Sequence, residues 1–77
     1  MPRISYLIHN AETGRRLSIG TTDTDQPPAD LAADLVQRNR TEHSYYTGPR
    51  TCWIWAPADE SLAHLETAPA AAQRFDL

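Results

Sequence analysis

The sequence predicts a single α+β domain built on a three-stranded, mainly antiparallel sheet, with the element order β-β-α-β-α. Two segments near the N-terminus alternate between apolar and polar residues, a helical apolar pattern follows a pair of prolines, and the most apolar segment comes next. A chain of 77 residues has room for one hydrophobic core. We therefore expect a domain over residues 1–66 and a loosely ordered C-terminal tail over residues 67–77.

The first two strands are predicted from the alternating segments over residues 3–10 and 15–22. Alternation of this kind is typical of a strand, because successive side chains point to opposite faces of the sheet. The intervening "AETG" supplies the glycine of a tight turn. The two segments therefore indicate a β-hairpin.

The helices and the third strand follow from proline positions and apolar spacing. Two prolines open a helix over residues 28–39, and Leu31 and Leu35 lie four positions apart on its apolar side. The apolar segment over residues 50–56 predicts the third strand. A second Pro-Ala-Asp start predicts a short helix over residues 57–66.

The strand pattern assigns side chains to two sheet faces. The face toward the first helix would carry Ile4, Tyr6, Ile8, Leu17, Ile19, Cys52 and Ile54. The opposite face would carry Leu7, His9, Ser18, Trp53 and Trp55. The cysteine should be buried and unreactive.

The two tryptophans are two positions apart in a strand, so they should share one face. Two interpretations stay open: the second helix and the tail cover both indoles, or the face binds a partner, since tryptophan is enriched at binding hot spots. We expect at least one ring to stay partly accessible. Trp55, which lies nearer the strand end, is the better candidate, and Trp53 is the better candidate for core.

The loop over residues 41–50 is the second candidate binding element. It combines His43, Tyr45, Tyr46 and Arg50 with serine and glycine, the mixture that antibody binding loops use for contact. The alternative is that the tyrosines pack against the sheet edge. Together with the two tryptophans, these four residues form the predicted partner-binding set.

Composition argues against several classes of function. The net charge is −3, and nucleic-acid binding normally needs a basic surface. All seven basic residues are arginine, which indicates a GC-rich genome. The single cysteine, the lack of a long apolar segment and the absence of a signal-peptide pattern favour the cytoplasm and argue against a membrane.

The distribution of reactive residues predicts no cofactor, no metal and no enzymatic activity. The three histidines have no metal-ligand spacing, and no glycine-rich loop could hold phosphates. The sequence therefore predicts a small non-catalytic module that binds a protein partner or itself. Inhibitors and regulatory subunits of phage or bacterial type are comparably small and acidic.

The segment "SYLIHNAETGRRLSIGTT", over residues 5–22, resembles the opening hairpin of the GIY-YIG nuclease family. The matching residues are Tyr6, Asn10, Gly14, Arg15, Ile19, Gly20 and Thr22. The β-β-α-β-α order is also similar. The resemblance offers the alternative function, a GIY-YIG-like nuclease or nucleic-acid-processing protein.

The same resemblance implies roles for individual residues. Tyr6 would be a catalytic tyrosine, Arg38 or Arg40 would contact phosphate, and Glu66 would be the ligand of a magnesium ion. Ser18 stands where the family has its second tyrosine, so the resemblance implies a degenerate member.

Overall fold

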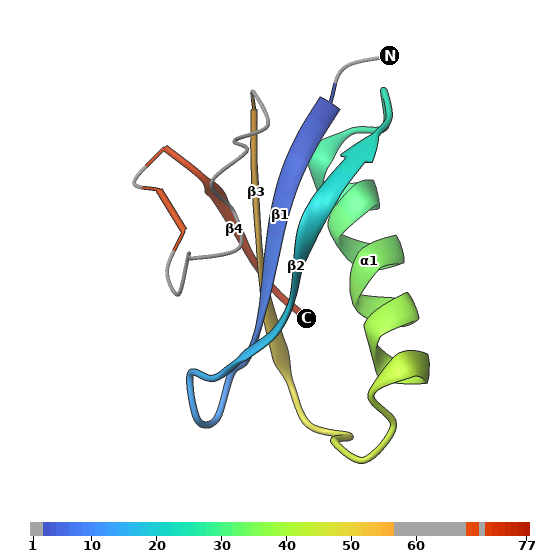
Figure 1. The fold of residues 1–77 in the computed structure, drawn as a ribbon, viewed down its shortest axis with the longest axis vertical. Coiled ribbons are helices and arrows are strands. Elements are labelled where there is room, and N and C mark those ends of the chain that lie inside the picture. The colour runs from blue at the N-terminus through green and yellow to red at the C-terminus, as the bar shows by residue number, and fades with distance from the viewer. Residues whose placement is uncertain (1–2, 57–67, 70) are drawn as a thin grey trace.

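The computed structural model describes residues 3–56, 68–69 and 71–77. The elements within these residues are β1 (Arg3–Asn10), β2 (Arg16–Asp23), α1 (Pro28–Glu42), β3 (Arg50–Trp55) and β4 (Gln73–Asp76). The strands form one antiparallel sheet in the order β2-β1-β3-β4, and α1 lies against one face of it (Figure 1). The predicted α+β class and the antiparallel pairing are confirmed.

The C-terminal strand β4 corrects the prediction of three strands and of a loose tail. It pairs with β3, and Phe75 lies opposite Cys52. Backbone hydrogen bonds between Arg50 and Leu77, at 2.8 and 3.3 Å, extend the pairing. Only one of its four residues is apolar, so no alternation marked it in the sequence. The predicted helix over residues 57–66 lies outside the described residues.

The turn between β1 and β2 forms as predicted. The Asn10 side-chain oxygen accepts hydrogen bonds from the backbone N–H groups of Glu12 and Thr13, at 2.8 and 3.2 Å. Gly14 has φ of 75°, a conformation that other residues adopt only with strain. The sequence signal was correct because it rested on this requirement for glycine.

A register shift in the hairpin changes the predicted faces of β2. Ile8 pairs with Ser18, but His9 pairs with Arg16, which leaves Leu17 as the extra residue of a bulge. Leu17 therefore packs on the helix-side core, whereas Ile19 lies on the opposite face. The predictions that Leu17 and Ile19 share a face and that Ser18 faces away from α1 were wrong.

The main core lies between the sheet and α1. Its buried members are Ile8, Leu31, Ala32, Leu35, Val36, Cys52 and Ile54. The leucine spacing predicted this face, although α1 continues to Glu42, three residues beyond its predicted end. Cys52 is buried as predicted, and burial raises the pKa of its thiol to about 12. The thiol therefore stays protonated near neutral pH.

The opposite face holds a smaller cluster around both tryptophans. Trp55 and Trp53 pair with Ser5 and Leu7 of β1, so they share one face, as predicted. Trp55 is only 8% exposed, whereas Trp53 is half-buried, the reverse of the predicted order. Trp55 lies opposite a serine, whose small side chain leaves space for an indole.

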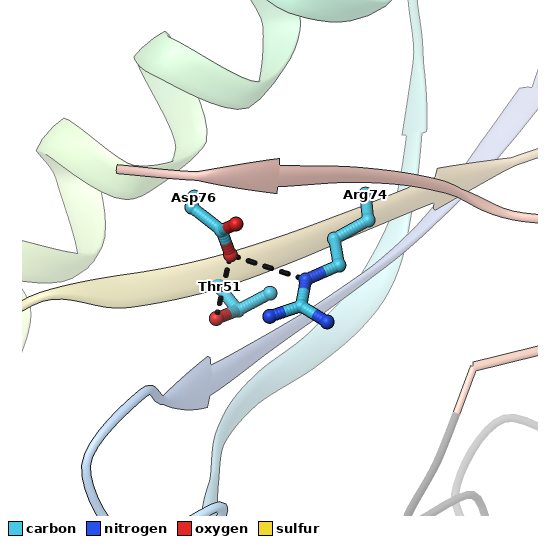
Figure 2. Close-up of polar contacts among 3 residues, drawn as sticks. All are labelled: Thr51, Arg74 and Asp76. Atoms are coloured by element: carbon cyan, nitrogen blue, oxygen red, sulfur yellow. Dashed lines mark hydrogen bonds and ion pairs between the residues drawn. The ribbon is translucent and has the colours of Figure 1, made fainter.

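A polar row borders the exposed side of Trp53. The Asp76 carboxylate accepts hydrogen bonds from the Thr51 hydroxyl at 3.2 Å and from Arg74 Nε at 3.1 Å (Figure 2). The Arg74 guanidinium lies 5.9 Å from the centre of the Trp53 ring, and the His9 ring meets that indole edge-on at 4.6 Å. Trp53 therefore contacts both the apolar cluster of Leu7 and Trp55 and the polar side chains of His9 and Arg74.

Candidate functional site

The predicted partner-binding residues occupy three different environments. Arg50 and Trp55 are buried, and His43, Tyr46 and Trp53 are half-buried. Tyr45 is 78% exposed. Trp53 contacts side chains on the face away from α1, whereas Tyr45 belongs to the loop over residues 43–49 that joins α1 to β3. We call residues 43–49 the presenting loop.

Arg50, predicted as a partner contact, instead holds the presenting loop from inside the fold. Its side chain is fully buried, and Nε donates to the Asn39 side-chain oxygen at 2.6 Å. Its other nitrogens donate to three backbone carbonyls of the loop, those of His43 (3.2 Å), Tyr46 (2.8 Å) and Gly48 (3.0 Å). Burial, together with the nearby charge of Arg40, lowers the pKa of this guanidinium.

A second arginine braces the same loop from α1. Arg40 donates to the carbonyl oxygens of Thr47 at 3.4 Å and Gly48 at 3.1 Å. Its remaining terminal nitrogen donates to the backbone oxygen of Leu77 at 2.8 Å. The helix, the presenting loop and the residue after β4 are therefore tied together by one side chain.

Tyr46 forms the inner wall of the presenting loop. Its hydroxyl lies 2.7 Å from the Pro49 carbonyl oxygen and 3.0 Å from a Glu12 carboxylate oxygen, and its proton can serve either acceptor. Desolvation and the hydrogen bond to Glu12 raise the pKa of this phenol. A Cβ at Gly48 would lie 2.7 Å from the ring, so any other residue there would displace the Tyr46 side chain. The loop is thus packed against the β1–β2 turn.

Tyr45 projects outward from this braced loop. Its hydroxyl lies 3.3 Å from Nδ1 of His43, and the two rings meet edge-on with centres 5.7 Å apart. Beside it is a hollow of about 250 Å³, which we call the arginine hollow. It is lined by Asn10, Arg15, Arg16, Leu17 and Tyr45. The composition of the loop indicated Tyr45 as a candidate. It did not indicate Arg15 and Arg16, because the bulge at Leu17 beside them cannot be recognised in the residue pattern.

A smaller pocket lies between the hairpin and the C-terminal half of α1. Its volume is about 90 Å³, and it is lined by Tyr6, Ile8, Ser18, Leu35, Arg38, Asn39 and Glu42. We call it the Tyr6 pocket. The Tyr6 ring lies over Gly20, where a Cβ would come within 2.9 Å of the phenol oxygen. Glycine opposite this tyrosine therefore leaves the space that the ring occupies.

Asn39 gives the Tyr6 pocket a buried donor without a partner. Its side-chain oxygen must face the donor Arg50, so the amide orientation is settled, and Nδ2 points away. Nδ2 is buried and has no hydrogen-bond partner. Asn39 follows Leu35 by one helical turn, so a polar residue on the apolar stripe was the available sequence signal.

The residues implied by the GIY-YIG resemblance are only partly brought together. Tyr6 and Arg38 line the same pocket, whereas Arg40 is engaged with the presenting loop. Glu66 lies outside the described residues. Glu42, which the sequence did not indicate, is the acidic side chain of the pocket.

The described residues contain neither a metal centre nor a membrane-spanning helix. Among them, no group of three or more His, Cys, Asp and Glu side chains could hold a metal ion. Within the same part of the chain, no helix has the length and apolar character needed to cross a membrane.

No protein-family model matches the chain, and neither does any curated protein or solved structure compared with it.

Proposed function

We propose that this chain is a small, non-catalytic, cytoplasmic protein-binding module of the inhibitor or regulatory-subunit type. It acts through Tyr45 and the presenting loop. One observation carries the proposal: a fully buried arginine holds the loop that carries a 78% exposed tyrosine. The partner is another protein.

The physical argument for binding rests on preorganisation. A loop that is ordered before association loses less conformational entropy on binding, so more of the contact energy appears as affinity. Tyrosine supplies a large, rigid contact surface with few rotatable bonds. A buried guanidinium is costly without partners, yet three of its four hydrogen bonds hold loop carbonyls. The desolvation cost of burying Arg50 is therefore consistent with a function that needs the loop in one fixed shape.

The proposed surface is narrower than the set predicted from the sequence. Arg50 and Trp55 are buried and support it from within. His43 and Tyr46 flank Tyr45 and orient the loop, through the contacts of their side chains with Tyr45 and Glu12. Trp53 lies on the sheet face away from α1 and is not part of this surface.

Photo-crosslinking from position 45 tests the proposal. We expect p-benzoylphenylalanine at Tyr45 to form a specific adduct in a lysate of the native host, and the same group at exposed Gln37 on α1 to form none. Tyr45→Ala should weaken capture of that partner at least about tenfold, as hot-spot residues do. It should change the free energy of unfolding by less than about 0.5 kcal/mol, because the ring is exposed.

The crosslinking result has clear contrary outcomes. Equal adducts from positions 45 and 37, or capture that Tyr45→Ala leaves unchanged, would remove the presenting loop as the binding surface. An adduct with twice the mass of the chain would replace the partner protein with self-association.

A second candidate function is binding of a nucleic-acid phosphate in the Tyr6 pocket, as a degenerate GIY-YIG-like protein. One specific observation favours it: Tyr6, Arg38 and the unpartnered amide of Asn39 line one pocket. Arginine and amide N–H groups are suitable donors to a phosphate oxygen. The candidate is limited to binding because the resemblance implies a degenerate member, with Ser18 in place of the family's second tyrosine.

Duplex DNA binding separates the two candidates. For the protein-binding module we expect an anisotropy titration at 150 mM salt to show affinity weaker than the roughly 10⁻⁴–10⁻⁶ M of non-specific binders. Low-micromolar binding that Arg38→Gln weakens at least about tenfold would favour the Tyr6 pocket instead. Arg3→Gln, on the far end of β1, is the matched control.

A further inference from the structure

We propose that the Tyr6 pocket binds a small zwitterion, a free amino acid the size of glycine or alanine. This inference goes beyond the protein-binding module, and it gives the pocket a different ligand from the phosphate of the second candidate function. The pocket has a volume of about 90 Å³, and a water molecule takes up about 30 Å³ in the liquid. A ligand of a few non-hydrogen atoms therefore fits, whereas a nucleotide would extend well beyond the pocket.

The first argument is the pair of opposite charges that line the pocket. Arg38 and Glu42 are exposed side chains one helical turn apart on α1. Among the described residues, no hydrogen bond or ion pair engages either side chain. An arginine four positions before an acid is the weaker order of a helical charge pair, so a ligand would have little to displace. One positive and one negative group favour a ligand that carries both charges and no net charge.

The second argument is the set of polar groups without partners around the same pocket. Asn39 is only 2% exposed, and its Nδ2 is buried without a hydrogen-bond partner. Tyr6 and Ser18 also line the pocket, and no hydrogen bond engages their hydroxyl groups within the described residues. A carboxylate has two acceptor oxygens, so one can accept from Asn39 while the other meets the Arg38 guanidinium.

The third argument selects an amino acid over a phosphate. A phosphate in the pocket would bring its negative charge beside the Glu42 carboxylate, which repels it. The ammonium group of an amino acid would instead pair with that carboxylate. Ile8 and Leu35 supply apolar walls, which suit a hydrogen atom or a methyl group as the ligand's side chain. Alanine therefore presents a matching group to each part of the lining.

Amide NMR on the full chain tests this inference with L-alanine as the probe. We expect saturable shifts of the Asn39 side-chain amide and of the backbone amides of Ile8 and Leu35, with a Kd of about 1–10 mM for so small a ligand. Acetate and methylammonium each carry only one of the two charges. They should bind at least about threefold more weakly, because each lacks one exposed charge contact.

Two charge variants separate the two ends of the ligand. Glu42→Gln should weaken alanine binding about threefold to fivefold and leave acetate binding unchanged or stronger, because only the ammonium group meets this carboxylate. Arg38→Gln should weaken the binding of both. The matched controls are Asp30→Asn and Arg3→Gln, at exposed charges outside the pocket, which should change alanine binding less than about twofold.

The contrary outcomes are distinct. An Asn39 amide that does not shift at alanine concentrations well above about 10 mM would overturn the inference. Equal binding of acetate and alanine would make the pocket a simple anion site, and tighter binding of inorganic phosphate or a thymidine dinucleotide would assign it to the second candidate function. Either result would also overturn the amino-acid ligand. None of them bears on the presenting loop, which crosslinking from position 45 tests separately.

Discussion

Replacing Arg50 with leucine is expected to lower the free energy of unfolding by about 3–5 kcal/mol. The substitution leaves the buried oxygen of Asn39 without a donor, and an unsatisfied buried group costs about 1–3 kcal/mol. The Tyr46 carbonyl loses its donor as well, whereas the Gly48 carbonyl keeps Arg40 and the His43 carbonyl keeps the backbone N–H of Tyr46. The loss is large because small domains have only about 0.05–0.15 kcal/mol of stability per residue.

Urea denaturation of matched variants measures this effect. Arg74→Leu is the control, because that side chain is 62% exposed and should change stability by less than about 0.5 kcal/mol. Arg50→Lys keeps a charge but has one compact donor group where arginine has a planar fork, so it should recover only part of the loss. The slope m should stay constant if the change is in stability alone.

A loss below about 1 kcal/mol for Arg50→Leu would contradict the structural role of the arginine. It would indicate that the carbonyls of the presenting loop are satisfied by water when the guanidinium is removed. The loop would then not be preorganised, and the main argument for a binding role of Tyr45 would fail with it. The variant therefore tests the function as well as the fold.

The role of Arg50 shows why part of the site could not be predicted from the sequence. Residues beside a glycine and a proline at a strand start are usually solvated, so an arginine there indicates a surface contact. Its burial depends on backbone carbonyls that its own loop turns inward, and backbone orientation is not visible in side-chain patterns. Of the two loop tyrosines, Tyr45 is exposed and Tyr46 is half-buried, a difference that loop composition does not indicate, and the partner-binding role of Tyr45 stays a prediction.

The fold was predictable where the chemistry is periodic. The leucines of α1 and the alternation of β1 identified the main core, and Gly14 identified the turn. β4 was missed because a strand of four residues with one apolar side chain has no measurable period. The bulge at Leu17 was missed because an extra residue changes faces without changing composition.

The tryptophan pair gives the second large expected effect. Trp55→Ala should lower the free energy of unfolding by about 3–5 kcal/mol, because the ring is only 8% exposed and its removal leaves a large cavity. Trp53→Ala should cost about 1–2 kcal/mol, since part of that indole already contacts water. The strand register places both on one face, so the difference arises from their neighbours.

Single-tryptophan variants allow the pair to be resolved in one assay. With Trp53→Phe, the remaining emission comes from Trp55 and should be blue-shifted and poorly quenched by acrylamide. With Trp55→Phe, the emission of Trp53 should be quenched more readily, because that indole is only half-buried.

Equal quenching of the two rings would show that the face away from α1 is more open, or more covered, than its burial indicates. If Trp55 proved the more accessible ring, the order expected from its place near the strand end would be restored. The indole pair would then compete with the presenting loop as the binding surface. A shielded Trp55 beside a partly shielded Trp53 leaves Tyr45 as the more exposed aromatic, since its ring is 78% exposed and neither indole approaches that value.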